Sequence, residues 1–215
     1  KDVAVSGDGF AKNEGATYAV TGTITDPGTK DNAFTYTLNE GTQAANYNIT
    51  TEAGKLTITK VTKEIVITAA SDEKKYDGSP LTNSGYTYTE GVLAEGDVLT
   101  AVVEGTITNA GTEANKVKSY QVKRGDTDVT GNYTFGKSVD GKLEVTKRTV
   151  KLTSATDSKV YDGKPLTNSN VTVSGDGFAK DEGATYSVTG TITDPGTKDN
   201  TFTYTLNEGT LAAHY

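Results

Sequence analysis

The chain has 215 residues, with 21 basic and 28 acidic side chains and a formal net charge of -7 at pH 7. An acidic chain without a basic cluster argues against nucleic-acid binding, because lysines and arginines must displace the counterions of phosphates. The absence of cysteine excludes disulfides, thiolate zinc sites and cysteine nucleophiles. No apolar run approaches about 18 residues, so we expect no membrane insertion by this sequence.

The composition favours many short strands and turns with small cores. Hydrophobic residues make up 33% of the chain, and threonine and glycine are its commonest residues. The apolar positions are mostly Val, Ile, Leu and Tyr, which suit a pleated, half-buried surface. Since these residues recur at regular spacing, the sequence indicates a folded chain rather than a disordered one.

Alternation of apolar residues with threonine predicts strands along the whole chain. In Phe34–Leu38, for example, the two aromatic side chains and the leucine share one face and the threonines share the other. The segments with this pattern, in chain order, are 20–25, 34–38, 56–59, 65–67, 143–145 and 150–152.

Turn and helix signals complete the prediction of local structure. Asp26-Pro27-Gly28-Thr29 has the residues of a type II turn, with proline second and glycine third. Asp77-Gly78 and Asp162-Gly163 should each bend the chain before an extended x-Pro pair. The best helical candidate is 95–103, matched by 11–20, and glycine interrupts both. The predicted class is therefore all-β, with at most one short helix per repeat.

An internal repeat is the strongest signal in the sequence. Residues 3–47 realign onto 171–215 with only six differences in 45 positions. A more diverged copy lies between them. Its Tyr-Asp-Gly motif consists of Tyr76, Asp77, Gly78, Pro80 and Leu81, and the last copy has the matching residues Tyr161, Asp162, Gly163, Pro165 and Leu166. A second match pairs Asn132 and Tyr133 of the central copy with Asn46 and Tyr47 of the first.

These matches define a unit of about 85 residues that begins before Tyr-Asp-Gly and closes on a Gly-Lys-Leu strand. The predicted domains are an N-terminal repeat, 1–60, that lacks the opening segment; a complete central repeat, 61–147; and a C-terminal repeat, 148–215, that lacks the closing segment. We expect the chain to be part of a longer array. Each domain should be a small β-sandwich or β-grasp-like module in an elongated row.

Four features in order resemble the YDG and MBG-type (mostly β-grasp) tandem repeats of large bacterial adhesin-like surface proteins. They are Lys75-Tyr76-Asp77-Gly78, Gly96-Asp97, Asn132-Tyr133 and the Gly-Lys-Leu-x-Val-Thr-Lys segment 141–147. The resemblance covers the whole chain. It implies an extracellular, cell-surface or cell-wall location, as in Gram-positive stalk proteins, and a spacer or adhesion role without catalytic residues.

Candidates for catalysis are weak. The single histidine, His214, replaces Asn46 of the near-identical copy, so we interpret it as surface variation. The carboxylate pairs Asp72-Glu73 and Asp181-Glu182 lie in polar, glycine-flanked segments typical of solvated loops. We therefore expect no enzyme, and no cofactor.

Three binding or cross-linking alternatives stay open. Calcium is a candidate ligand of 174–177 or 194–200, although neither has EF-hand spacing. The twelve tyrosines are candidates for stacking on host glycan or mucin. A Lys–Asn isopeptide bond would join Lys63 or Lys151 to Asn132, and it requires a buried lysine.

The sequence thus predicts non-catalytic stalk repeats that extend an adhesive or functional tip from the cell envelope. Expected partners are neighbouring repeats and, in the alternative of an adhesin module, a host glycan or protein. The incomplete outer repeats predict one further contact, edge-strand pairing between chains, because open strand edges are templates for pairing.

Overall fold

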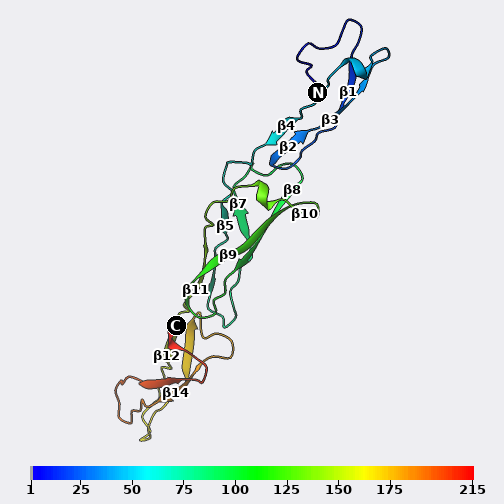
Figure 1. The fold of residues 1–215 in the computed structure, drawn as a ribbon. Helices are drawn as coiled ribbons and strands as arrows, with labels where there is room; N and C mark the ends of the chain where they lie inside the picture. Colours follow the sequence, from blue (N-terminus) through cyan, green and yellow to red (C-terminus); the bar gives the residue numbers. More distant parts are fainter. Residues whose placement is uncertain (1) are drawn as a thin grey trace. The chain divides into compact units, whose positions relative to one another are not determined.

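The computed structural model describes residues 2–215, which form two compact units. Unit 1 comprises the chain up to Ile65 with Thr89–Thr100 and Gln121–Gly136. Unit 2 comprises Val66–Tyr88, Ala101–Tyr120 and Lys137–Tyr215. Within the described residues the regular structure is all-β, with short 3-10 turns and no α-helix (Figure 1). The predicted class is confirmed.

Unit 1 is built from the threonine-rich N-terminal sequence and two segments of the central repeat. Its first antiparallel pair joins β1 (Ala16–Val20) to β3 (Phe34–Leu38), which places Tyr18 opposite Tyr36. Its second joins β2 (Gly28–Asn32) to β4 (Gly54–Ile58). Two further elements of this unit are the short strand β10 (Thr127–Asp128) and the 3-10 turn Thr130–Asn132.

Unit 2 contains the longest run of paired strands. The parallel pair of β6 (Asp72–Lys75) and β11 (Gly141–Thr146) continues into β9 (Gly111–Arg124), which runs antiparallel to β11. Strand β9 and its neighbour β8 (Asp97–Glu104) contribute residues to both units. The remaining antiparallel pairs are β5 (Ile67–Ala69) with β7 (Tyr86–Tyr88), β12 (Val150–Ser154) with β13 (Val171–Gly175), and β14 (Ala184–Val188) with β15 (Phe202–Leu206).

The core of unit 2 gathers around β11. Leu143 is fully buried and Val145 is nearly so, whereas the residues between and beside them are partly or fully exposed. They pack in one cluster with Tyr76, Leu81 and Ala179. The alternation predicted for 143–145 is therefore confirmed, and it delivers both apolar side chains to the same side of the sheet.

The predicted helix is wrong. Residues 95–103 and 11–20 lead into strands β8 and β1. In β8 the side chains of Leu99 and Val103 are buried while those of Val98 and Val102 are exposed, which is the period of a strand. Gly96, with φ 80, breaks any helical turn before the strand begins.

Two local predictions near Gly22 and Gly28 need correction. The strand expected over 20–25 ends at Val20, because the N–H groups of Thr21 and Gly22 both donate to Ala33 O and interrupt the ladder. Gly28 does have positive φ, but at 152° it is far from the value of about +80° that a type II turn requires. The prediction that this position needs glycine is confirmed, and the turn type is wrong.

The limits of the two compact units do not coincide with the boundaries at 60/61 and 147/148 that the sequence repeat predicts. The repeat boundaries therefore remain a prediction from the sequence. Among the described residues there is no helix long and apolar enough to cross a membrane.

Candidate functional site

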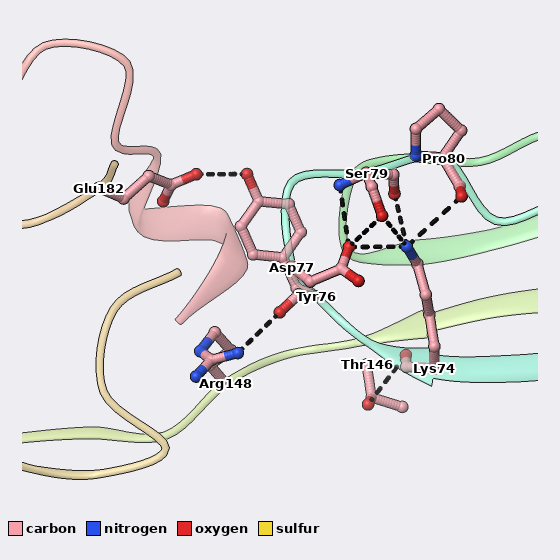
Figure 2. Close-up of polar contacts among 8 residues, drawn as sticks. All are labelled: Lys74, Tyr76, Asp77, Ser79, Pro80, Thr146, Arg148 and Glu182. Carbon is pink, nitrogen blue, oxygen red and sulfur yellow. Dashed lines mark hydrogen bonds and ion pairs between the residues drawn. The ribbon is translucent and has the colours of Figure 1, made fainter. Parts of the chain in front are cut away.

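The Tyr-Asp-Gly segment of the central repeat folds into a tight loop held by one lysine (Figure 2). Lys74 Nζ donates to Asp77 Oδ1 at 2.7 Å and to Ser79 O at 2.7 Å, and it lies 3.4 Å from Pro80 O. Asp77 Oδ1 also accepts the backbone N–H of Ser79 at 2.9 Å. Gly78 has φ 81, which glycine adopts without strain. The predicted bend is confirmed.

The same loop recurs in the C-terminal repeat. Lys159 Nζ donates to Asp162 Oδ1 at 2.8 Å and to Pro165 O at 3.3 Å. Asp162 Oδ1 accepts the N–H of Lys164 at 3.0 Å, and Gly163 has φ 73. Because the loop closes through its own residues in both copies, its shape is set locally.

The loop predicts a pH dependence. The hydrogen bond from Lys74, supported by Ser79, lowers the pKa of Asp77 from 3.8 to about 2. Ionised Asp77 therefore stabilises the fold above pH 3.8, and this contribution is lost as the pH falls through about 2. In a carboxyl NMR titration, we expect Lys74→Met to raise the pKa of Asp77 towards 3.8, while Lys75→Met leaves it low. An Asp77 midpoint near 4 in the unaltered chain would contradict this assignment.

Tyr76, the first residue of the Tyr-Asp-Gly loop, packs against residues of the C-terminal repeat. Tyr76 is only 5% exposed, and its hydroxyl donates to Glu182 Oε1 at 2.5 Å. Its ring lies 3.8 Å from the ring of His214, centroid to centroid, and meets Tyr215 edge-on at 6.3 Å. The hydrogen bond to the carboxylate raises the pKa of Tyr76 to about 12, so the hydroxyl stays a donor at neutral pH.

One arginine fixes the backbone around this tyrosine. Arg148 donates from Nη1 to Tyr76 O at 3.1 Å, from Nε to Gly177 O at 2.8 Å and from Nη2 to Asp176 O at 2.5 Å. Lys75 forms an ion pair with Asp176 at 2.5 Å, and that contact holds the pKa of Asp176 well below its usual range. Together these contacts link the central repeat to the segment 175–177 of the next repeat. We call the contacts made by Tyr76, Lys75 and Arg148 the junction.

A second tyrosine arrangement occurs three times, and its C-terminal instance supplies the carboxylate and the tyrosine ring that Tyr76 contacts. In each instance a tyrosine hydroxyl donates to a carboxylate and accepts an alanine N–H at 3.0 Å. The three sets are Ala11, Glu14 and Tyr47; Ala94, Asp97 and Tyr133; and Ala179, Glu182 and Tyr215. Glu182 thus accepts both Tyr76 and Tyr215, one hydroxyl on each oxygen.

In the central repeat this arrangement includes an ion pair between a buried carboxylate and a partly exposed arginine. The carboxylate of Asp97 is completely buried and receives Arg124 Nε at 2.6 Å, Arg124 Nη2 at 3.0 Å and the Tyr133 hydroxyl at 2.5 Å. The arginine lowers the pKa of Asp97. The side-chain amide of the neighbouring Asn132 donates to Asp26 at 2.8 Å. The motif residues Asn132 and Tyr133 are thus structural contacts.

The interpretation of His214 as surface variation is wrong, because its side chain is 3% exposed and stacks on Tyr76. The carboxylates proposed as catalytic pairs also have structural partners. Glu182 binds two tyrosine hydroxyls, and Asp72 accepts the N–H of Glu73 and the amide of Asn83.

The calcium and isopeptide candidates gain no support. Within residues 2–215, no three acidic or histidine side chains form a metal-binding group, and Asp176 of the segment 174–177 binds Lys75 and Thr149 instead. Lys63 and Lys151 are both exposed, whereas an isopeptide bond needs a buried lysine.

Sequence reasoning missed Lys74 and Arg148, and it considered Glu182 only as part of a carboxylate pair for catalysis. One signal was available for the first, since a lysine precedes Tyr-Asp-Gly by two positions in both copies. Another was available for Glu182, since Glu14 stands at the matching position of the near-identical copy. No protein-family model, no curated protein and no solved structure matches the chain.

Proposed function

We propose that the chain consists of non-catalytic spacer repeats from the stalk of a bacterial surface protein, where they extend an adhesive or functional tip from the cell envelope. The observation that carries the proposal is the junction. The Tyr-Asp-Gly tyrosine, a motif residue of one repeat, is buried against the carboxylate and rings of the next. A motif used for joining repeats suits a spacer, whose property is length.

The chemistry of the polar residues that recur within the chain supports the same proposal. Each carboxylate of the recurrent tyrosine arrangement is held by hydroxyl donors within the fold. A spacer needs such fixed contacts, whereas a general acid or base must reach a substrate. The extracellular location comes from the resemblance to YDG and MBG-type repeats.

A spacer should lengthen when a repeat is added. We expect a chain in which 61–147 is duplicated to have a longer maximum dimension and an unchanged cross-section in X-ray scattering. The result that would count against a spacer is a larger cross-section with little change in maximum dimension, because it would mean that the added repeat folds back onto its neighbours.

A second candidate function, glycan binding, is favoured by a different observation. Four tyrosines, Tyr36, Tyr120, Tyr161 and Tyr204, are 38%, 39%, 61% and 57% exposed, and every repeat contributes at least one of them. In the outer repeats Tyr36 and Tyr204 lie opposite another tyrosine across the sheet, Tyr18 and Tyr186 respectively. The exposed rings of Tyr36 and Tyr204, which stand at matching positions of the two outer repeats, offer stacking surfaces for sugar rings.

The glycan-binding alternative predicts that mucin glycopeptides bind the unaltered chain in titration calorimetry. Replacing Tyr36, Tyr120 and Tyr204 together with alanine should then weaken binding by about tenfold or more, which corresponds to about 1.4 kcal/mol. Replacing the neighbouring strand residues Thr35 and Thr203 with serine serves as the control and should leave the affinity unchanged. Absence of binding heat with the unaltered chain would contradict the alternative and leave the spacer function.

A further inference from the structure

The carboxylate of the tyrosine arrangement in the C-terminal repeat has two partners, one of them from the repeat before it. One oxygen of Glu182 accepts the hydroxyl of Tyr215, and the other accepts the hydroxyl of Tyr76 from the central repeat. His214 precedes Tyr215, and its ring lies 3.8 Å from the ring of Tyr76 between centroids. We call Glu182, His214 and Tyr215 the acceptor of this repeat, because together they receive Tyr76.

The matching acceptor of the central repeat is Asp97, Asn132 and Tyr133, and its carboxylate is filled from within the same repeat. One oxygen of Asp97 receives Arg124 Nε at 2.6 Å, and the other receives Arg124 Nη2 at 3.0 Å and the hydroxyl of Tyr133 at 2.5 Å. This carboxylate is completely buried. The oxygen that is not used by the tyrosine of the arrangement is therefore taken by Arg124 in the central repeat, and by Tyr76 in the C-terminal repeat.

Arg124 belongs to an insertion that the outer repeats lack. The segment from Asn115 to Tyr133 spans 18 positions, whereas those from Asn32 to Tyr47 and from Asn200 to Tyr215 each span 15. Asn115 and Asn200 occupy matching places, since each side-chain amide donates to two corresponding carbonyl groups of its repeat. The longer segment folds into the hairpin of β9 and β10, which carries Arg124. Two types of repeat thus differ in their acceptor, the outer type with glutamate and the central type with an aspartate–arginine pair.

The central acceptor meets an acidic loop of the N-terminal repeat. Asn132 Nδ2 donates to Asp26 Oδ1 at 2.8 Å, and Arg124 Nη1 lies 3.6 Å from the same oxygen. The central repeat has Asn109 where the N-terminal repeat has Asp26, so its own loop carries no carboxylate at this position. The repeat with the acidic loop therefore precedes the acceptor with the arginine, and the repeat without it is joined to the next one through Tyr76.

A tyrosine hydroxyl is poorly matched to the central acceptor. Both oxygens of Asp97 already receive donors, and the group beside them is a guanidinium, which has no acceptor to offer. Burying a hydroxyl without an acceptor is unfavourable. Asn132 also lacks the aromatic ring with which His214 stacks on Tyr76. A mismatch of this kind discriminates between partners as effectively as a favourable contact does.

We propose that a Tyr-Asp-Gly tyrosine docks only on an acceptor of the outer type, so that a central-type repeat is joined to an outer-type repeat and not to another central-type repeat. Glu182 and Arg124 are the residues that set this choice of partner, the first by receiving the tyrosine and the second by filling its place. The order of this chain, outer then central then outer, follows the rule. The inference rests on the proposed function in one respect, since both treat the chain as repeats joined in series.

A chain in which 61–147 is duplicated offers both acceptors in one molecule. Tyr76 of the first copy is followed by the acceptor with Arg124, and Tyr76 of the second copy is followed by the acceptor with Glu182. Two versions are compared, each with Tyr76→Phe in one copy, and nitration of the remaining Tyr76 by tetranitromethane is followed by peptide mass spectrometry. We expect the first Tyr76 to react at least about tenfold faster, because the hydrogen bond to Glu182 keeps the second buried and its hydroxyl protonated.

An exchange of acceptors provides the converse test. In the second copy, Asp97→Glu together with 206–215 in place of 121–133 creates an outer-type acceptor, and we expect it to slow nitration of the first Tyr76 to the rate of the second.

Equally slow nitration of both tyrosines in the duplicated chain would overturn the selectivity and leave the spacer function standing. A first Tyr76 that stays reactive after the exchange would also overturn it. In the unaltered chain, Tyr76 reacting as fast as the exposed Tyr161 would remove the junction itself, and with it the observation that carries the proposed function.

Discussion

Replacing Tyr76 with alanine is expected to lower the free energy of unfolding by about 3 kcal/mol, the range found when a buried aromatic side chain is removed. The ring is 5% exposed and packs against His214, Tyr215 and the core residue Leu81. The change also leaves Glu182 with one hydroxyl donor in place of two. Urea unfolding followed by circular dichroism measures the loss.

The chain supplies a matched control in Tyr161, which opens the same loop in the C-terminal repeat but is 61% exposed. Tyr161→Ala should change the free energy of unfolding by no more than about 0.5 kcal/mol, as is usual for exposed positions. Tyr76→Phe should fall between the two at about 1 kcal/mol, because it removes the hydrogen bond to Glu182 and keeps the ring. Equal losses for Tyr76→Ala and Tyr161→Ala would mean that the junction does not stabilise the fold.

The second large effect is expected at Leu143. Its side chain is completely buried in the core around β11, so Leu143→Ala should lower the free energy of unfolding by about 3 kcal/mol, from lost burial and the cavity left behind. The change removes no hydrogen bond, since the backbone pairs of β11 with β6 and β9 remain.

Leu56 is the matched position in β4, where only one edge is paired and the side chain is half-buried. Leu56→Ala should therefore lower stability by only about 1 kcal/mol at protein concentrations low enough to keep chains apart. Both variants are compared by urea unfolding. A loss at Leu56 as large as that at Leu143 would show that β4 is as well enclosed as β11.

Local features of this fold could be predicted from the sequence because they depend on neighbouring residues. The alternation in 143–145 places two apolar side chains on one face whatever the strand pairs with. Asp77-Gly78 bends because glycine takes positive φ and the carboxylate caps the N–H of Ser79. The helix expected at 95–103 failed because glycine and paired valines outweighed a weak local preference.

The junction could not be predicted because it depends on residues far apart in the chain. Tyr76 and Glu182 are separated by 106 positions, and nothing in either local pattern indicates that they meet. His214 was interpreted as a variable surface residue because the near-identical copy has Asn46 at the matching position. Its burial comes from Tyr76, a residue of another repeat. Alternation defines faces of strands, whereas contacts between repeats depend on how the strands are ordered.

Small-angle X-ray scattering at several dilute concentrations tests the spacer proposal most directly. A row of small domains joined in sequence should give a radius of gyration of about 30 Å and a long tail in the distance distribution. A single compact body of this length should give about 17 Å. The spacer account predicts the larger value, and the smaller one would contradict it, because repeats that fold onto one another cannot add length.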